Sequence, residues 1–248
     1  MRARAEAESR EVAAFRERDQ LRSALLSSVG HDLRTPLTGI IGAAAELRQQ
    51  GGKDPALLAT IEGEAGKLER YITNLLDMAR IEAGAVKLKT EPVDLVDAVA
   101  AAIKDLRPSL GEREIDVTLA DNLPLVRADA QLLHHCLINL IDNAARYSDA
   151  GAAIRVAATV IRGEVRLTVE DEGPGLPQDA ERALDAFSRI SGSDRKGGAG
   201  IGLAIVKAFA EAMGAKVLAA NRDLGGAIFT LLFPKALVMK AAETADAG

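Results

Sequence analysis

Two stretches near the start of the chain, Leu26 to Leu47 and Leu58 to Ala79, repeat apolar residues at steps of three and four. This spacing constrains the fold more strongly than any other feature of the sequence. It places the apolar side chains on one stripe of an α-helix, as in coiled coils and helical bundles. Each stretch is therefore predicted to form an amphipathic helix.

The segment between these stretches is predicted to be a turn. Gly51 and Gly52 can end the first helix, while Asp54 and Pro55 supply an N-cap and a first-turn proline for the second. So short a connection makes the two helices an antiparallel hairpin. Because two helices cannot bury both of their apolar stripes, we expect a homodimer that completes a four-helix bundle.

Beyond Gly84 the pattern changes to that of a mixed α/β domain, with segments of alternating or β-branched residues between helical ones. The predicted strands are 86–89, 113–119, 153–161, 164–171, 216–221 and 227–233, and the predicted helices lie near 94–107, 129–147, 179–187 and 201–213. Consecutive strands mixed with helices favour an α/β sandwich over a doubly wound sheet. The expected fold class is therefore α+β, a helical hairpin followed by a sandwich.

These patterns divide the chain into four segments. Residues 1–20 are predicted to be an upstream helical linker, 21–86 the hairpin domain, 90–236 the sandwich domain and 237–248 a flexible tail. No run reaches the roughly 18 apolar residues that a membrane span needs, and Met1 is not followed by a signal peptide. We expect a cytoplasmic protein, or the soluble part of an inner-membrane protein whose upstream segments are missing.

Composition narrows the range of partners. The net charge of −5 argues against a strongly electrostatic nucleic-acid binder, although it leaves room for a local basic patch, and we expect no nucleic-acid partner. The single cysteine, Cys136, cannot form an internal disulfide and fits a reducing compartment, where it is expected to be a small buried apolar residue.

The first histidine, His31, lies in a helical stretch that contains two residues unfavourable to helices. On that helix His31 and Thr35 fall opposite Val29 and Leu33, on the solvent face, and Asp32 stands beside them. An exposed histidine without function would occupy the same position. Pro36, however, costs a helix interior about 3 kcal/mol, and Gly30 costs about 1 kcal/mol more. Two residues that destabilise the helix so close to His31 favour a functional role for this histidine.

The chemistry that suits this cluster is nucleophilic attack by an imidazole nitrogen. The carboxylate of Asp32 can hydrogen-bond the other ring nitrogen, fix the tautomer and offset the positive charge that develops. The hydroxyl of Thr35, one turn away, can orient water for the reverse, hydrolytic reaction. The cluster is therefore predicted to be a phosphate-acceptor site, which requires a phosphate donor elsewhere in the chain.

The second half of the chain contains motifs that suit a donor site. Asn139 and Asn143 share one helical face, and two such poor helix formers in register indicate contact with a ligand or metal. A predicted strand leads into the D-x-G-x-G pattern at Asp171, Gly173 and Gly175, which by itself also occurs in ordinary turns.

A third motif places Gly198, Gly200 and Gly202 before an apolar helix. Alternate glycines at a helix N-terminus let backbone N–H groups approach phosphates. The spacing is neither that of a Walker A loop nor that of a Rossmann fingerprint.

The order of these motifs, closed by Gly225 and Gly226 before the last predicted strand, resembles that of the sensor histidine kinases. The resemblance extends over residues 20–236. The stretches HDLRTPLT, LLDMARIEAG and NRDLGGAIF are similar to the potassium-responsive sensor kinases of the Kdp type.

The resemblance implies a dimerisation and histidine-phosphotransfer hairpin joined to a Bergerat-type ATP-binding sandwich. It implies autophosphorylation of a histidine with ATP and Mg²⁺, then transfer to an aspartate in the receiver domain of a cognate response regulator, with phosphatase activity toward that regulator. The Kdp likeness extends this expectation to potassium or osmotic signalling.

The resemblance also assigns roles to individual residues. His31 becomes the phosphorylated residue, Asp32 its acid partner and Thr35 the phosphatase residue, while Asn143 becomes the Mg²⁺ ligand and Asp171 the adenine-binding aspartate. The remaining nucleotide-site residues are Asn139, Arg146, Tyr147, Gly173, Gly175, Arg189, Gly198, Gly200, Gly202 and Leu203.

Three departures from the family pattern affect this assignment. Gly30 replaces the serine or alanine common before the histidine, and Ala227 stands where threonine is frequent. The segment 183–190 keeps Phe187 and Arg189 but lacks the earlier Phe-Glu pair. These departures bear most on the segment that would close over the nucleotide.

Two other classes of protein share some of these motifs. An ATPase of the gyrase, chaperone or mismatch-repair type would have the D-x-G-x-G pattern and the glycines, but would normally carry glutamate at Asn139 and would not need His31. A phosphotransfer scaffold with a degenerate nucleotide domain would usually have lost Asn143, Asp171 and the glycines. Magnesium-dependent ATP binding separates the scaffold from the kinase.

Overall fold

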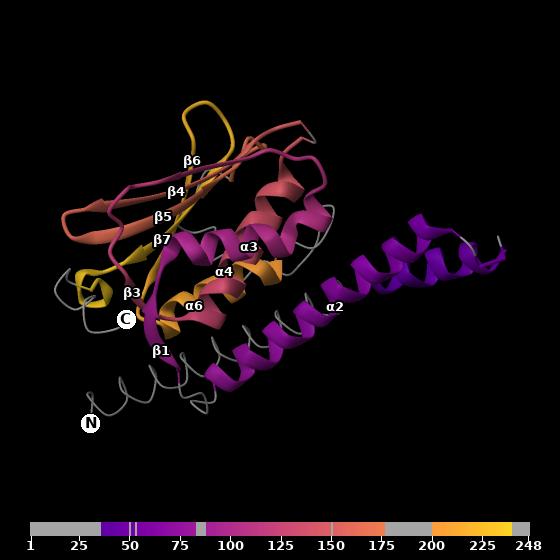
Figure 1. Cartoon of the computed structure of the whole chain (residues 1–248), viewed down its shortest axis with the longest axis horizontal. Helices are drawn as coiled ribbons and strands as arrows, with labels where there is room; N and C mark the ends of the chain where they lie inside the picture. Colours follow the sequence, from indigo (N-terminus) through magenta and orange to yellow (C-terminus); the bar gives the residue numbers. More distant parts are fainter. Residues whose placement is uncertain are drawn as a thin grey trace, which may run out of the picture. The chain divides into compact units, whose positions relative to one another are not determined.

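The computed structural model describes residues 36–49, 51–52, 54–82, 88–149, 151–176 and 200–239. These residues form a helical hairpin and an α/β sandwich (Figure 1). The chain divides into two compact units, with the boundary inside the long helix α2 (Pro55–Glu82), after Leu68. Among the described residues, no helix combines the length and the apolar character that crossing a membrane requires.

The turn of the hairpin has the structure that the sequence predicts. Gly51 and Gly52 adopt φ values of 77° and 79°, and the backbone N–H of Gly52 donates to the carbonyl of Leu47 at 2.8 Å. The carboxylate of Asp54 accepts from the backbone N–H of Ala56 at 2.8 Å and so caps α2. The predicted turn and N-cap are therefore confirmed.

The centre of the sandwich is a five-stranded sheet in the order β2-β4-β5-β7-β6. Its strands are β2 (Ile115–Leu119), β4 (Ile154–Ile161), β5 (Glu164–Glu170), β6 (Lys216–Asn221) and β7 (Ala227–Phe233). Strands β2 and β4 are parallel, and the other neighbours are antiparallel. A separate antiparallel pair joins β1 (Thr90–Val93) to β3 (Val126–Asp129).

Three helices cover one face of the sheet (Figure 1): α3 (Leu95–Leu110), α4 (Ala130–Tyr147) and α6 (Gly200–Ala212). Alternate residues of β5 and β7 point into the core between the sheet and these helices. The helices contribute Leu106, Leu137, Leu140, Ile205 and Phe209, each no more than 1% exposed. Each large apolar side chain buried in this way contributes about 1.5–3 kcal/mol.

Most of the predicted elements are present, with three differences. The strand predicted at 86–89 is wrong, because Leu88 and Lys89 are not in a strand and β1 begins at Thr90. Strand β3 was not predicted, since its four residues form a strand only by pairing with β1. Helix α3 continues through Pro108 to Leu110, because a proline in the last turn interrupts few helical hydrogen bonds.

The start of the predicted tail is attached to the sandwich. A short 3₁₀ helix, η1 (Lys235–Leu237), is followed by a bridge between Val238 and Val126, and the backbone N–H of Met239 donates to Leu125 at 2.9 Å. The rest of the tail, the linker 1–20 and the helix predicted at 179–187 lie outside the described residues.

Candidate functional site

The D-x-G-x-G motif forms a loop directly after β5, and its aspartate is fixed by backbone contacts. Asp171 is 3% exposed. Its N–H donates to the carbonyl of Ala227 at 3.0 Å, and its Oδ1 accepts from the N–H groups of Ala227 and Gly173 at 3.1 and 2.8 Å. Within the described part of the chain, both hydrogen bonds to this carboxylate end on Oδ1, so Oδ2 is left to accept from a ligand.

Close backbone approaches explain two glycines of the site. A Cβ on Gly173 would lie 2.5 Å from the carbonyl oxygen of Tyr147, at the end of α4. Gly226 has a φ of 92°, and its Cβ would overlap the carbonyl oxygen of Asp171. Any other residue would separate the loop from α4 or from the β6–β7 turn.

The two asparagines of α4 have different surroundings although their spacing suggests equal roles. The Nδ2 of Asn139 donates to the carbonyl of His135 at 2.7 Å, and a Cβ on Gly202 of α6 would lie 3.2 Å from its Oδ1. Asn143, one turn later and half-buried, makes no side-chain hydrogen bond to any described residue. Asn139 therefore helps α4 and α6 to pack closely, and Asn143 is the member of the pair whose amide is left for a ligand.

Three side chains lie at the end of α4, and one of them, Ser148, contacts the same loop. Arg146 is exposed and lies 3.5 Å from Asp142, and Tyr147 is half-buried. Ser148 is 8% exposed; its Oγ donates to the carbonyl of Ala144 at 2.7 Å and accepts from the N–H of Glu172 at 3.3 Å. Sequence reasoning missed Ser148, although a serine that directly follows a helix is a signal for such a bond.

Two further residues missed from the sequence, Asn221 and Arg222, connect the end of β6 to the loop. The side-chain amide of Asn221 accepts from the N–H of Leu176 at 2.5 Å and donates to its carbonyl at 2.9 Å. The guanidinium of Arg222 lies 3.1 Å from the carboxylate of Glu170 and donates to the carbonyl of Asp171 at 2.8 Å. Both residues open the stretch NRDLGGAIF, and the likeness of that stretch to the Kdp-type sensor kinases is the signal for them in the sequence.

Arg155, in β4 on the face of the sheet away from the three helices, also contacts this loop. Arg155 pairs with Glu172 at 2.6 Å and lies 3.9 Å from Asp116. The hydrogen bond that Arg155 donates to Glu172 is the main cause that raises the pKa of Arg155. Glu172, the second residue of D-x-G-x-G, is thus held by both Arg155 and Ser148.

Burial controls the titration of two residues of α4. It is the main cause that lowers the pKa of His135, with His134 as the second cause. Burial also raises the pKa of the Cys136 thiol, which is fully buried. A thiol in this environment is not reactive, so the expectation that Cys136 is a core residue is confirmed.

The structure locates part of the predicted site. Gly200 begins α6, and Leu203, three residues later, is 2% exposed, so its side chain packs in the core. The loop meets the end of α4 at Gly173, and α6 meets α4 where Gly202 lies beside Asn139, so most of the predicted nucleotide residues of the described sandwich lie on these three segments. His31, Asp32, Thr35, Arg189 and Gly198 lie outside the described residues.

The oxygen donors of this region suit a magnesium ion that is shared with a nucleotide better than an ion held by the protein alone. Among the described residues, no three histidine, cysteine or acidic side chains gather as a metal cluster. Mg²⁺ usually keeps several waters and binds through one or two protein oxygens together with substrate phosphates. The amide oxygen of Asn143 would be such a protein ligand.

Two family matches cover more than half of the chain. Residues 21–84 match the His Kinase A (phospho-acceptor) domain, and residues 128–237 match the histidine kinase-, DNA gyrase B- and HSP90-like ATPase. The chain belongs to the sensor histidine kinases. The phospho-acceptor match distinguishes it from a gyrase-type or chaperone-type ATPase, which the second match alone would allow.

Individual relatives agree with this membership. The sensor protein KdpD of Escherichia coli is 38% identical over 224 residues, which are 88% of this chain and 25% of that protein. The histidine kinase AdeS of Acinetobacter baumannii has a TM-score of 0.60 at 25% identity, over 82% of this chain and 97% of that one. Full-length ShkA, solved in complex with AMPPNP, has a TM-score of 0.60 at 30% identity, over 90% of this chain and 46% of that one.

The comparisons confirm the α+β fold class and the two kinds of domain expected of a protein histidine kinase. They also confirm the likeness to the Kdp sensor kinases. The chain spans about a quarter of the length of the Escherichia coli relative.

Proposed function

We propose that this chain is the catalytic core of a sensor kinase that phosphorylates His31 from Mg-ATP and passes the phosphoryl group to an aspartate of a response-regulator receiver domain. One observation above all supports this proposal. A phospho-acceptor domain at 21–84 is joined to an ATPase domain whose buried Asp171 keeps one carboxylate oxygen for a ligand. A degenerate nucleotide domain would not be expected to preserve that arrangement.

The nucleotide would be recognised by groups at both of its ends. The Oδ2 of Asp171 would accept from the 6-amino group of adenine, because a carboxylate is an acceptor-only group. The glycines before α6 would let backbone N–H groups approach the phosphates. The similar kinase ShkA was solved with AMPPNP, a triphosphate analogue, which supports a triphosphate in this fold.

The transfer itself would be an in-line displacement. The imidazole nitrogen of His31 attacks the γ-phosphorus, the new N–P bond forms, and the bond from phosphorus to the bridging oxygen of ADP breaks. The carboxylate of Asp32 would hold the other ring nitrogen and balance the charge on the imidazole. Asn143 would hold Mg²⁺ together with the phosphates, and the ion would neutralise part of the triphosphate charge.

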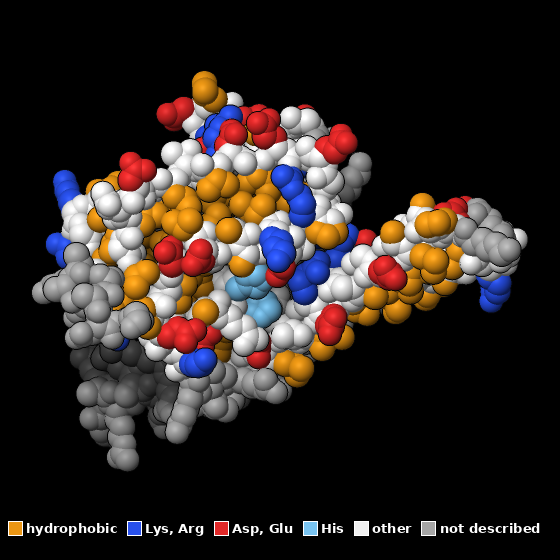
Figure 2. Space-filling view, in the orientation of Figure 1, with side chains coloured by type: hydrophobic (Ala, Val, Ile, Leu, Met, Phe, Trp, Pro, Cys, Tyr) orange, Lys and Arg blue, Asp and Glu red, His pale blue; other side chains and the backbone are white. Residues whose placement is uncertain are grey.

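A second copy of the chain is the proposed partner of the hairpin. The described helices of the hairpin expose large apolar side chains, visible in orange along them in Figure 2. Those at least 44% exposed are Leu37, Ile41, Leu58, Ile72 and Leu76. A four-helix bundle formed by two copies would bury this stripe.

The finer parts of the proposal follow from the family likeness. Thr35 would orient water for dephosphorylation of the regulator. The likeness to the Kdp sensor kinases extends the proposal to potassium or osmotic signalling, with this core on the cytoplasmic side of the membrane.

The first prediction tests the acceptor. Incubation with Mg-ATP labelled at the γ-phosphate should give a protein label that is labile in acid and stable in base, as expected of a phosphoimidazole. His31→Ala should abolish the label and leave the affinity for Mg-ATP within about twofold of wild type, because the nucleotide motifs lie in the other domain match.

His134→Ala is the matched control, because it removes another histidine, one that is half-buried and bonded to Asp105 at 3.0 Å. It should keep the label. Persistence of the label in His31→Ala would exclude His31 as the acceptor. Failure of the wild-type chain to bind Mg-ATP would instead favour a phosphotransfer scaffold.

A further inference from the structure

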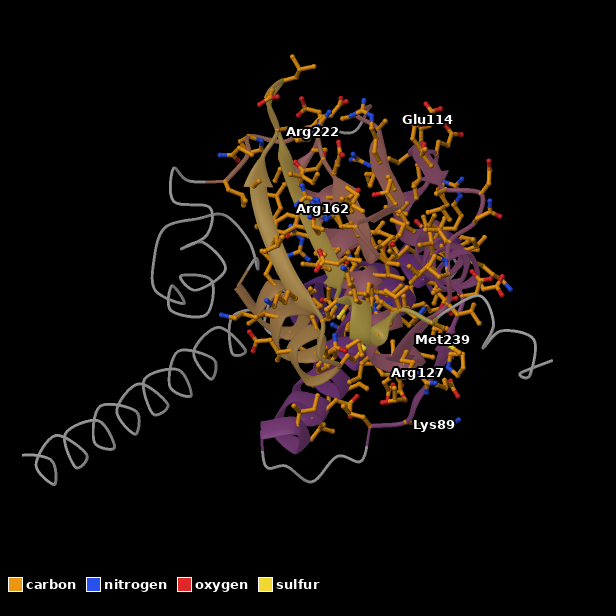
Figure 3. All side chains as sticks on the ribbon, turned by 90° about the vertical axis from the view of Figure 1, so that its left-hand side faces the viewer. Lys89, Glu114, Arg127, Arg162, Arg222 and Met239 are labelled. Carbon is orange, nitrogen blue, oxygen red and sulfur yellow. The ribbon has the colours of Figure 1, made fainter. Side chains whose placement is uncertain are left out.

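The backbone of Asp171 is held from outside the nucleotide region by the side chain of Arg222. Figure 3 shows Arg222 at the end of the sheet that is opposite to Arg127 and Met239. Its guanidinium contacts three segments: the carboxylate of Glu170 in β5 at 3.1 Å, the carbonyl of Asp171 at 2.8 Å and the carbonyl of Gly225 at 3.3 Å. The side chains of Arg222 and Glu170 are 17% and 25% exposed, so water screens their ion pair only partly.

This arrangement completes a set of hydrogen bonds on both sides of the Asp171 residue. The N–H and the Oδ1 of Asp171 are bonded to the backbone of Ala227, and its carbonyl is bonded to Arg222. Rotation of either peptide group of Asp171 would break one of these bonds. The direction of the carboxylate is therefore set partly by Arg222, a residue 51 positions later in the chain.

Asn221 holds the far end of the same loop. Its amide bonds both the N–H and the carbonyl of Leu176, as a neighbouring strand would do. A Cβ on Gly175 would lie 2.7 Å from the Oδ1 of Asn221, so the last position of D-x-G-x-G must be glycine for this contact to form. The last residue of β6 and the residue after it therefore fix the end and the start of the loop.

We propose that Arg222, assisted by Asn221, is a positioning residue for adenine recognition: it holds Asp171 so that Oδ2 accepts from the 6-amino group of the purine. The inference rests on the proposed function, because it assumes that Asp171 binds adenine. Only an arginine offers forked donors that reach a carboxylate and two carbonyls at once. A lysine keeps the charge for Glu170 but cannot reproduce the fork.

The test compares two nucleotides on the same protein sample. ADP and purine riboside diphosphate, which lacks only the 6-amino group, are titrated into the full chain with Mg²⁺ by calorimetry. The wild-type chain should bind ADP about tenfold more tightly or better, as expected for one hydrogen bond to a charged acceptor. Arg222→Met should reduce this preference to about twofold or less, mainly by weakening ADP, and Arg222→Lys should give an intermediate value.

Arg166→Met is the matched control. Arg166 lies in β5 on the same face as Glu170, and it makes no hydrogen bond to the described part of the loop. This variant should keep the wild-type preference. A purely structural role for Arg222 would weaken both nucleotides by the same factor, and that result in both Arg222 variants would overturn the inference. Absence of any preference in the wild-type chain would instead refute the adenine role of Asp171, and with it this part of the proposed function.

Discussion

At the scale of single residues, the carboxylate of Asp171 shows how one side chain can serve the fold and a ligand at once. Its Oδ1 accepts hydrogen bonds from two backbone N–H groups, and these bonds offset much of the free-energy cost of burying the carboxylate. The other oxygen is then held in a fixed direction without a described protein donor. An acceptor of this kind, on a residue that is 3% exposed, discriminates between ligands, because a ligand without a matching donor leaves it unpaired.

Asp171→Asn is therefore expected to reduce the affinity for Mg-ATP by about tenfold or more while the protein stays folded. The asparagine can keep its oxygen at the position of Oδ1, but it then presents an NH₂ group toward the 6-amino group of adenine. Calorimetric titration measures the affinity, and thermal unfolding checks the fold. Asp121→Asn, at an exposed turn position, is the control. Wild-type affinity in Asp171→Asn would mean that this carboxylate does not bind the base.

At the scale of secondary-structure elements, one N-cap orients the helix that carries both asparagines. The Oδ1 of Asp129 accepts from the N–H groups of Gln131 and Leu132 at 3.1 and 3.2 Å, which caps α4. Its Oδ2 accepts from the N–H of Lys89 at 2.9 Å, just before β1. The same carboxylate thus fixes the start of α4 and the entry of the chain into the β1–β3 pair.

Asp129→Ala should lower the free energy of unfolding of the sandwich by about 1–2 kcal/mol, the usual cost of removing an N-cap, with about 0.5–1 kcal/mol more for the lost bond to Lys89. Asp94→Ala is the control, because Asp94 caps α3 through the N–H of Val96 alone. Urea unfolding followed by circular dichroism measures both. An equal or smaller loss in Asp129→Ala would show that the Lys89 bond adds no stability.

Helices and strands with a regular pattern of apolar residues could be predicted from the sequence. Contacts between a side chain and a backbone group far away in the sequence could not. The turn at Asp54 and the strands β6 and β7 follow from local pattern alone. The short strands β1 and β3 depend on pairing with each other. Helical spacing alone could not separate the role of Asn139 from that of Asn143, because the surroundings of Asn139 depend on its bond to His135 and on its contact with Gly202 of α6. Arg222 was missed since its bond to Asp171 spans 51 positions.

At the scale of the whole molecule, the proposed acceptor and the nucleotide residues belong to different domain matches, 21–84 and 128–237. Under the proposed function, autophosphorylation would require the two domains to meet, whereas dephosphorylation of a regulator would use the hairpin and the bound receiver domain. The two activities should therefore depend on different residues of the same helical turn, and substitutions there should separate them.

Thr35→Ala should keep most autophosphorylation and lose most phosphatase activity. Thr35 lies one turn after His31 on the same predicted face, so its hydroxyl can orient a water toward a phosphoryl group above the helix, and attack by His31 on ATP needs no such water. Asp32→Asn should show the opposite bias, because autophosphorylation relies on a carboxylate to stabilise the imidazole as it becomes cationic. Both activities are measured with the same regulator and the same Mg²⁺ concentration. Equal losses of the two activities in Thr35→Ala would mean that Thr35 supports the helix beside Pro36 and does not position water.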